Sequence, residues 1–382
     1  MRIAYFTESL YPHVDGVSRT LARLFASLES RDEEFLIFSP FTPGDEVSWS
    51  DRVRPVRYVR FPLYSDYRIS LPVVSGSVGR EMKAFRPDLV HVVSPTPMAI
   101  WAQLWAARHG VPVVSSFHTH FVSYFRYYGV PWLQSGGWWA LRRFYARCAR
   151  VYAPSFSIIR ELESHGLERI ELWSRGIDLA GFSPEFRDPN LRRDAGADDQ
   201  TPLVLLVSRL VREKDLADLV ETEQILTERG VRFSLVLVGD GPMRRELDSS
   251  LPTATFAGHQ SGEQLARWYA SADIFVFPST TETLGNVVLE ALASGVPAVV
   301  TDRCGPQDLV RTGENGFIVR GNAPEEMADR VELLLRDGEL RARMASAARE
   351  SAITRDWEEI NGGLAESYRT VVREATIPGR ES

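Results

Sequence analysis

The stretch STTETLGNVVLEA, residues 279–291, decides how this chain is interpreted. Residues 273–278 before it have the pattern of a buried strand, and residues 286–294 have the pattern of a helix that stops before a glycine. Glu282 is therefore expected at the carboxyl end of a strand, just before the N-terminus of a helix. Sheets of the α/β class bind phosphorylated ligands at such a position.

These residues suit a sugar that carries a diphosphate. Glu282 can accept hydrogen bonds from sugar hydroxyls, and Glu290, two turns into the helix, can reach a ribose. The helix N-terminus attracts the phosphates through the backbone of Leu284, Gly285, Asn286 and Val287. The same pattern also fits a plain helix start, where the helix dipole favours an acidic side chain.

Length and composition indicate a soluble globular protein of two domains. The chain has 382 residues, with 44% hydrophobic and 25% charged residues. It contains no apolar run as long as a membrane span, and it enters a strand directly, so we expect no signal peptide. Two cysteines, Cys148 and Cys304, argue against a disulfide framework or a metal cluster and favour a reducing cytoplasm.

The charge is unevenly distributed. Residues 1–182 carry 21 Lys+Arg against 17 Asp+Glu, whereas residues 183–382 carry 23 against 34. No acidic residue occurs between Asp88 and Glu161. The basic N-terminal half therefore suggests an anionic partner there, such as a lipid surface, a phosphorylated acceptor or the phosphates of a nucleotide.

Strands and helices alternate along both halves of the chain. We predict strands at 2–7, 34–38, 56–60, 89–93, 111–116, 150–153, 170–173, 203–208, 234–239, 255–257, 274–278, 298–301 and 316–319. Helices are predicted at 18–29, 97–108, 214–229, 243–249, 264–271, 286–294 and 324–336. The pattern predicts an α/β protein with two Rossmann-like, doubly wound domains that face each other across a cleft. A polar, turn-rich break covers residues 182–200.

A second anion-binding signal follows the strand at 203–208. Arg209 and Lys214 occur in SRLVREK, residues 208–214, at the sheet edge where Glu282 is also expected. Lys214 is one of only two lysines among 44 basic residues, which suggests that its compact ammonium matters here. The sequence VGDGP, residues 238–242, fits a tight turn as well as it fits a ligand contact.

An aromatic and basic stretch covers residues 121–132 and 138–147. Interfacial helices combine tryptophan, tyrosine and arginine in this way. The stretch fits a membrane surface, a wall of the acceptor site, or a buried helix with arginines at its rim. The candidate residues are Tyr124, Tyr128, Trp138, Trp139, Arg142 and Arg143.

In combination, these motifs resemble the family 4 retaining glycosyltransferases of the GT-B fold, over essentially the whole chain. The segments at 7–17 (TESLYPHVDGV), 115–121 (SSFHTHF) and 172–178 (LWSRGID) resemble one branch of that family. This branch contains GDP-mannose-dependent α-mannosyltransferases and the sulfoquinovosyltransferases. Cys304 replaces one glycine of the Gly-Gly-Pro that is usual in the branch, which leaves the donor open.

The resemblance implies a division of labour between two domains. It implies an acceptor domain at 1–178, a donor domain at 179–356, and a C-terminal helix at 357–382 that packs back onto the first. Gly16 would let the backbone approach the donor, and His118 would face the donor sugar, although a loop histidine satisfied by backbone groups is the alternative. The remaining implied roles are the diphosphate for Arg209 and Lys214, sugar hydroxyls for Glu282, ribose for Glu290, and the base for Gly258 and His259. His13 and His120 are expected to be structural.

The resemblance also implies transfer of a hexose with retention of configuration. The best candidate is mannose from GDP-mannose, moved to a lipid or glycolipid, with a UDP-sugar donor (sulfoquinovose or glucose) as the alternative. We expect no cofactor and no metal, because no Asp-x-Asp motif stands where a diphosphate-bound cation needs ligands. A front-face substitution is favoured over a double displacement through an enzyme carboxylate.

Two other classes of function remain open from the residues alone. A nucleotide-sugar epimerase or hydrolase would consume the donor without an acceptor, and a non-catalytic sensor would bind a sugar nucleotide without transferring it. We expect no nucleic acid partner. The expected location is the cytoplasm, with the aromatic stretch against the inner face of the cell membrane if the membrane interpretation holds.

Overall fold

The structure is a computed structural model that describes residues 1–45, 47–61, 64–71, 76–120, 122 and 131–376. The chain divides into two compact units. Unit 1 contains residues up to Val122, Trp132–Arg175 and the C-terminal segment from Trp357. Unit 2 consists mainly of Gly176–Asp356.

Unit 1 is built on a parallel sheet with strand order β3-β2-β1-β6-β7-β8-β9. The chain turns back at β1, so the loops after β1 and β6 mark its topological switch point. The strands are β1 Arg2–Phe6, β2 Glu34–Ser39, β3 Val53–Pro55, β6 Leu89–Val92, β7 Val113–Ser116, β8 Arg150–Ala153 and β9 Ile170–Leu172. The helices include α1 Gly16–Ser30, α2 Gly76–Phe85, α3 Pro97–His109, α5 Gln134–Tyr145, α6 Phe156–Ser164 and α14 Trp357–Thr376.

The strand predicted at 56–60 differs from the observed structure. The sheet instead gains β3, which pairs with β2 and ends at Pro55. Strand β4 Tyr58–Phe61 pairs antiparallel with β5 Tyr64–Ser70 in a separate hairpin. A proline has no N–H for a ladder, so the chain leaves the sheet at this edge and starts a new pairing.

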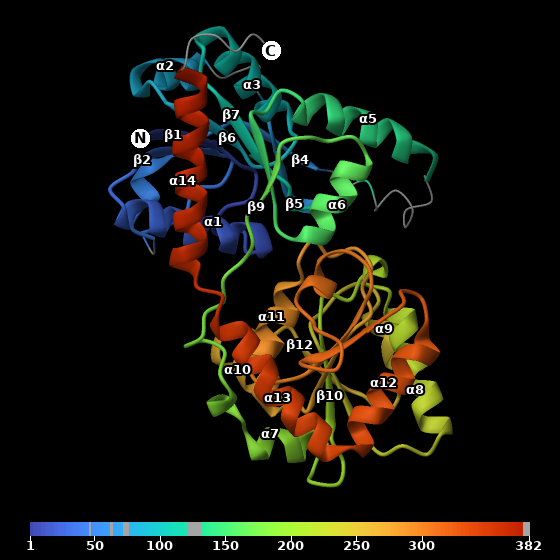
Figure 1. The fold of residues 1–382 in the computed structure, drawn as a ribbon. Coiled ribbons are helices and arrows are strands. Elements are labelled where there is room, and N and C mark those ends of the chain that lie inside the picture. The colour runs from blue at the N-terminus through green and yellow to red at the C-terminus, as the bar shows by residue number, and fades with distance from the viewer. Residues whose placement is uncertain (46, 62–63, 72–75, 121, 123–130, 377–382) are drawn as a thin grey trace. The chain divides into compact units, whose positions relative to one another are not determined.

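Helix α14 completes the core of unit 1 and packs against α1 (Figure 1). The Tyr368 hydroxyl contacts His91 Nδ1 at 2.6 Å, while His91 Nε2 contacts Ser116 Oγ at 3.0 Å. Tyr5 donates to the Tyr368 hydroxyl at 3.3 Å. A polar network at the centre of the sheet therefore depends on a helix from the far end of the chain.

Unit 2 is built on a second parallel sheet, with strand order β12-β11-β10-β13-β14-β15. Its strands are β10 Leu203–Val207, β11 Ser234–Val238, β12 Thr255–Gly258, β13 Ile274–Phe277, β14 Ala298–Thr301 and β15 Gly316–Val319. Its helices include α7 Pro189–Asp194, α8 Leu216–Glu228, α9 Arg244–Ser250, α10 Gly262–Ser271, α11 Asn286–Ala293, α12 Pro324–Arg336 and α13 Gly338–Ile353. The order reverses between β10 and β13, so the loops after these two strands flank the switch point.

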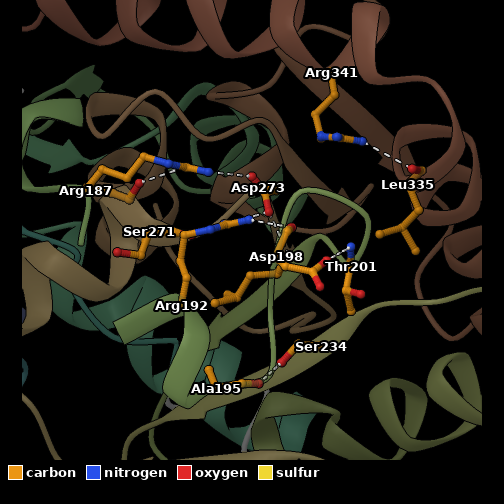
Figure 2. A network of polar contacts seen from close by, with 12 residues as sticks. Arg187, Arg192, Ala195, Asp198, Thr201, Ser234, Ser271, Asp273, Leu335 and Arg341 are labelled. Carbon is orange, nitrogen blue, oxygen red and sulfur yellow. Dashed lines mark hydrogen bonds and ion pairs between the residues drawn. The ribbon is translucent and has the colours of Figure 1, made fainter. Parts of the chain in front are cut away.

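The polar break at 182–200 is fixed to unit 2 by Asp273, the residue just before β13 (Figure 2). Asp273 Oδ2 accepts from Arg192 Nη1 and from the Leu203 N–H, both at 2.7 Å, and Oδ1 accepts from Arg187 Nη2 at 3.1 Å. Arg192 is buried, and its guanidinium also donates to the Ser271 carbonyl at 2.6 Å. The segment is therefore part of unit 2 and not a loose linker.

Candidate functional site

The loops after β10 and β13 lie beside each other because their strands are neighbours in the sheet of unit 2. The first loop carries Arg209 and Lys214, and the second carries Glu282. Side-chain bonds join the two loops at several points. Asp215 Oδ2 accepts from the Thr280 N–H at 2.8 Å and from its hydroxyl at 2.7 Å. The Thr281 hydroxyl donates to the Glu213 carbonyl at 2.8 Å.

Lys214 and Glu282 form an ion pair at this junction. The Lys214 ammonium donates to Glu282 Oε1. The Lys214 side chain is only 8% exposed, while the Glu282 side chain is 27% exposed. The lysine side chain is thus buried in the protein, whereas the carboxylate is partly exposed at the surface, where a ligand can contact it.

Arg209 lies at the same edge but extends into solvent. Its side chain is 62% exposed, and Nη2 lies 4.0 Å from Glu213 Oε1. A contact this long, made by a largely exposed guanidinium to the buried Glu213, contributes little to stability. The guanidinium can therefore turn to an incoming anion at low cost.

Helix α11 presents its N-terminus at the end of the second loop. The N-cap is Gly285, at φ +88°, which has no side chain to bond to the first turn. Leu284 is buried in the core of unit 2, whereas Asn286 and Val287 are half-buried. The bonds of the helix begin with the Val288 N–H, which donates to the Gly285 carbonyl at 2.9 Å, so the N–H groups of Asn286 and Val287 before it are the ones that suit an anion.

Cys304 keeps the backbone of a glycine. Its φ of +56° and ψ of −151° belong to a region that side chains rarely adopt. Next to it, Gly305 is required by packing, since a Cβ there would lie 2.2 Å from the Thr283 carbonyl oxygen. This loop backs directly onto the segment that carries Glu282.

Glu290 is more deeply placed than a ribose ligand at a surface would be. The residue is 7% exposed, and Oε2 accepts from the buried Tyr269 hydroxyl at 2.8 Å. A tyrosine from α10 therefore orients the carboxylate. Contact with a ribose stays a prediction.

Gly258 and His259 lie at the carboxyl end of β12. Gly258 has φ +68°, and its carbonyl accepts from the Gly239 N–H at 2.8 Å. His259 is exposed. Their place at the same sheet edge as Arg209 is compatible with contact to a base.

The glycines of residues 238–242 have a steric purpose. A Cβ on Gly239 would lie 1.8 Å from the Ser208 carbonyl oxygen, and one on Gly241 would lie 2.4 Å from the Leu210 carbonyl oxygen. The backbone after β11 thus packs closely against the loop that carries Arg209. The glycines of residues 238–242 therefore have a structural role, which is to allow this close packing.

In unit 1, Gly16 begins α1 and is exposed. Asp15 precedes it as the N-cap, and Oδ1 accepts from the Ser18 N–H at 2.7 Å and from the Ser9 hydroxyl at 2.6 Å. Burial raises the pKa of Asp15, but these bonds and one from His13 outweigh it and lower the pKa to about 2. The helix start is therefore well ordered around a permanently charged carboxylate.

His118 follows β7 and meets a buried arginine. Its Nδ1 lies 2.8 Å from Arg175 Nη2, and its ring stands edge-on to Trp173 with centroids 5.6 Å apart. Burial, with the charge of Arg175, places the pKa of His118 well below its usual value. His118 is therefore a neutral imidazole at physiological pH.

The other two histidines that we expected to be structural have protein partners. His120 is buried, and Nε2 contacts Glu161 Oε1 at 2.7 Å. His13 Nε2 lies 3.4 Å from Asp15 Oδ2, and its ring stacks on Phe41.

The aromatic and basic helix α5 corrects one expectation. Trp138 is buried, 9% exposed, and stacks on His165 with centroids 3.7 Å apart, so it cannot face a membrane or an acceptor. The sequence could not show this, because adjacent tryptophans point to different faces of a helix. Trp139 is 61% exposed, and Arg142 and Arg143 are exposed. Tyr124 and Tyr128 lie outside the described residues.

The exposed face of α5 and the two residues that follow this helix form an open hollow of about 370 Å³. It is lined by Trp139, Arg142, Arg143, Ala146 and Arg147. In the part of the chain that the structure describes, no helix is long and apolar enough to cross a membrane. Among all the residues that the structure describes, no group of three or more His, Cys, Asp or Glu side chains is placed to bind a metal ion.

The local sequence around Arg175, residues 172–178, indicates no role for this arginine. The contact to His118 spans 57 positions, so no local pattern could reveal it. Asp215 was missed for the same reason, since its partner Thr280 lies 65 positions away.

Two family models match the chain. The model described as Glycosyltransferase Family 4 covers residues 14–180, and the model described as Glycosyl transferases group 1 covers residues 187–351. A GDP-mannose-dependent alpha-mannosyltransferase of Mycolicibacterium smegmatis is 35% identical, over 97% of this chain and 98% of that protein. The sulfoquinovosyl transferase SQD2 of Arabidopsis thaliana is 32% identical, over 93% of this chain and 71% of that protein.

Solved structures share the fold at lower identity. The sucrose-phosphate synthase of Thermosynechococcus elongatus gives a TM-score of 0.76 at 20% identity, covering 98% of this chain and 99% of that one. Anabaena HepE in complex with UDP-glucose gives 0.74 at 20% identity, covering 97% and 100%. These likenesses confirm the predicted α/β fold of two Rossmann-like domains. With relatives above 30% identity over nearly its full length, and with the two family models in order along it, this chain belongs to the family 4 glycosyltransferases of the GT-B fold.

Proposed function

We propose that this glycosyltransferase moves a mannosyl group from GDP-mannose to a lipid or glycolipid acceptor, with retention of the anomeric configuration. The observation that carries the proposal is the Lys214–Glu282 ion pair at the switch point of unit 2. It joins the loop after β10, whose cations suit a diphosphate, to the loop after β13, whose carboxylate suits sugar hydroxyls. The identity of the donor is supported by relatives that are named GDP-mannose-dependent alpha-mannosyltransferases.

The donor would be held by charge and by backbone. Lys214 and Arg209 would take the diphosphate, together with the N–H groups of Asn286 and Val287 at the start of α11. Glu282 would then accept hydrogen bonds from sugar hydroxyls. His118 would contact the donor sugar, and Glu290 the ribose.

The reaction would follow a front-face course. The bond from the anomeric carbon to the phosphate oxygen breaks, and the acceptor hydroxyl forms its bond on the same face. The departing phosphate oxygen takes the acceptor proton. The cations at Arg209 and Lys214 would stabilise the charge that builds on the leaving diphosphate, as preorganised dipoles and charges do in enzymes.

The acceptor side is supported by the exposed face of α5. Trp139 offers a ring for the headgroup region, and Arg142, Arg143 and Arg147 offer positive charge to anionic lipid. We propose that this face holds the enzyme at the inner face of a membrane, where a lipid acceptor is met. Metal-independent transfer is part of the same proposal, since the protein supplies positive charge itself.

A second candidate is transfer from a UDP-sugar. It is favoured by the similarity to a sulfoquinovosyl transferase and by Cys304, which departs from the glycine expected in the branch. The two candidates share the clamp on the diphosphate and differ in the base and the sugar.

The test is release of nucleoside diphosphate by the purified enzyme, from GDP-mannose or UDP-glucose, with and without diacylglycerol or monoglycosyl-diacylglycerol in mixed micelles. Release from GDP-mannose that depends on the lipid supports the proposal. Release of UDP from UDP-glucose that depends on the lipid supports the second candidate. Equal release without any acceptor would indicate a hydrolase and contradict both.

A further inference from the structure

Arg175 is a buried cation without a carboxylate partner among the described residues. It is 5% exposed. Nη1 donates to the carbonyls of Trp173 at 2.8 Å and Ser174 at 3.1 Å, and the guanidinium lies 4.7 Å from the centroid of the Trp173 ring. Burying an uncompensated charge costs several kcal/mol as a rule. The guanidinium makes one further contact, to His118, and this contact can explain why a charged side chain is buried here.

The contact fixes the protonation of the imidazole. Arginine has only N–H donors, so His118 Nδ1 must accept the bond from Nη2 at 2.8 Å. A protonated imidazole has no lone pair on either nitrogen and cannot accept. A neutral imidazole whose lone pair is on Nδ1 carries its proton on Nε2.

The charged groups around His118 act mostly in one direction. Burial and then the charge of Arg175 lower the pKa of His118, and a proton on His91, from β6, would lower it further, whereas Asp15, at the start of α1, raises it. Burial also lowers the pKa of Arg175, to about 9, so the guanidinium is still charged at neutral pH. His91 itself is neutral, because burial lowers its pKa to about 3.

We propose that Arg175 is a positioning residue that holds His118 as a neutral imidazole with its proton on Nε2, so that Nε2 donates a hydrogen bond to a hydroxyl of the donor sugar. The last step rests on the proposed function, in which His118 faces the donor sugar. An imidazolium would set a full positive charge against the electron-poor anomeric centre of the transition state. Arg175 keeps its own charge one ring farther away.

The first test is NMR of the whole enzyme with ¹⁵N-labelled histidine, with the His118 signals identified by their absence in His118→Gln. We expect the Nε2–H tautomer and no titration between pH 5.5 and 8. In Arg175→Met the ring should titrate at a higher pH. An Nδ1–H tautomer in the wild type, or the same behaviour in Arg175→Met, would overturn the proposal.

The second test is the pH dependence of turnover. Wild-type kcat should be level on the acid side, because His118 stays neutral. Arg175→Met should create a loss of about tenfold that grows as the pH falls through the new pKa of His118, whereas Arg175→Lys, which still donates to Nδ1, should restore the level profile. The control is Arg150→Met. This variant removes a half-buried arginine that is paired with Glu171 at 2.8 Å, and it should leave the shape of the pH profile unchanged.

Two substitutions of His118 separate this inference from the proposed function. The amide nitrogen of glutamine can reach the position of Nε2, and that of asparagine only the position of Nδ1. His118→Gln should therefore keep more of the donor-dependent kcat than His118→Asn, and the reverse order would overturn the Nε2 assignment. Full activity in both would remove His118 from the donor site, and the proposed role with it, while the NMR result still tests the contact to Arg175.

Discussion

The ammonium of Lys214 contacts the carboxylate of Glu282 across 68 positions of sequence. Each of these groups satisfies the other in the free protein. A sugar nucleotide would replace the pair with two new contacts, phosphate on the lysine and hydroxyls on the glutamate. A ligand that offers only one of these two groups leaves the other residue without its partner.

Removal of the positive charges should disable transfer. Lys214→Ala and Arg209→Ala should each lower kcat/KM by at least about a hundredfold, or about 2.7 kcal/mol of transition-state stabilisation. The only other lysine, Lys83, is exposed on α2, so Lys83→Ala is the matched control and should be unaffected. Steady-state kinetics check this, and near-normal turnover in either site variant would sink the diphosphate assignment.

Glu282→Gln should separate the two halves of the donor. It removes the charge that accepts strong bonds from sugar hydroxyls, and it releases Lys214 to a phosphate. By calorimetry, GDP-mannose should bind more weakly than to the wild type, while GDP should lose less or gain. Glu263→Gln, at an exposed pair on α10, is the control. If both ligands weaken equally, Glu282 belongs to the nucleotide or is structural.

Chelation should not stop the reaction. We expect activity to survive EDTA, because Arg209, Lys214 and the start of α11 supply positive potential. The assay is transfer after dialysis against EDTA, with Mg²⁺ and Mn²⁺ added back. Complete loss with recovery on either cation would mean that a metal site exists.

The α5 face should bind anionic vesicles. A triple variant with Trp139→Ser, Arg142→Gln and Arg143→Gln should bind phosphatidylserine vesicles less well, since each cation near an anionic leaflet adds about 1 kcal/mol that salt screens. Sedimentation with vesicles at low and high salt measures this, with phosphatidylcholine as the reference. Binding of soluble donor should not change.

Trp138→Ser is the contrasting variant for that experiment. Trp138 is buried against His165, so its loss should destabilise the fold by about 3–5 kcal/mol without a specific effect on lipid. Wild-type protein that ignores anionic vesicles at low salt would refute membrane docking through this face.

Glu8 should make stability depend on pH. Burial raises its pKa to about 7, although hydrogen bonds with Thr96 and Ser70 oppose the shift. The folded carboxyl is therefore more readily protonated than the unfolded one, so its contribution is present below pH 4.5 and is lost as the pH rises through about 7. Glu8→Gln should raise the Tm relative to the wild type, and the gain should grow from pH 5 to pH 8. Parallel Tm curves would contradict a buried, protonated Glu8.

The sequence allowed the paired loops of unit 2 to be predicted because each follows a short apolar strand and precedes a helix. In parallel sheets this order alone brings Lys214 and Glu282 to one edge. The hairpin of β4 and β5 was not predictable in the same way, since an edge strand ending at Pro55 and a continuing parallel strand share one local pattern.

The parts that escaped prediction depend on long-range contacts. Trp138 and Trp139 are neighbours in sequence, and it is the Trp138 ring that packs against His120 and His165 and is buried. The role of Arg175 depends on its contact to His118, which lies in another loop. The tyrosine that orients Glu290 comes from a different helix, 21 positions earlier.

The return of α14 to unit 1 gives the chain a particular order of assembly. Residues 176–356 leave the ribosome, with everything that unit 2 needs, before Tyr368 exists to meet His91 and Tyr5. During synthesis the first unit to be started is therefore the last to be finished. A chain that stops early would carry an intact unit 2 and a unit 1 with an open core.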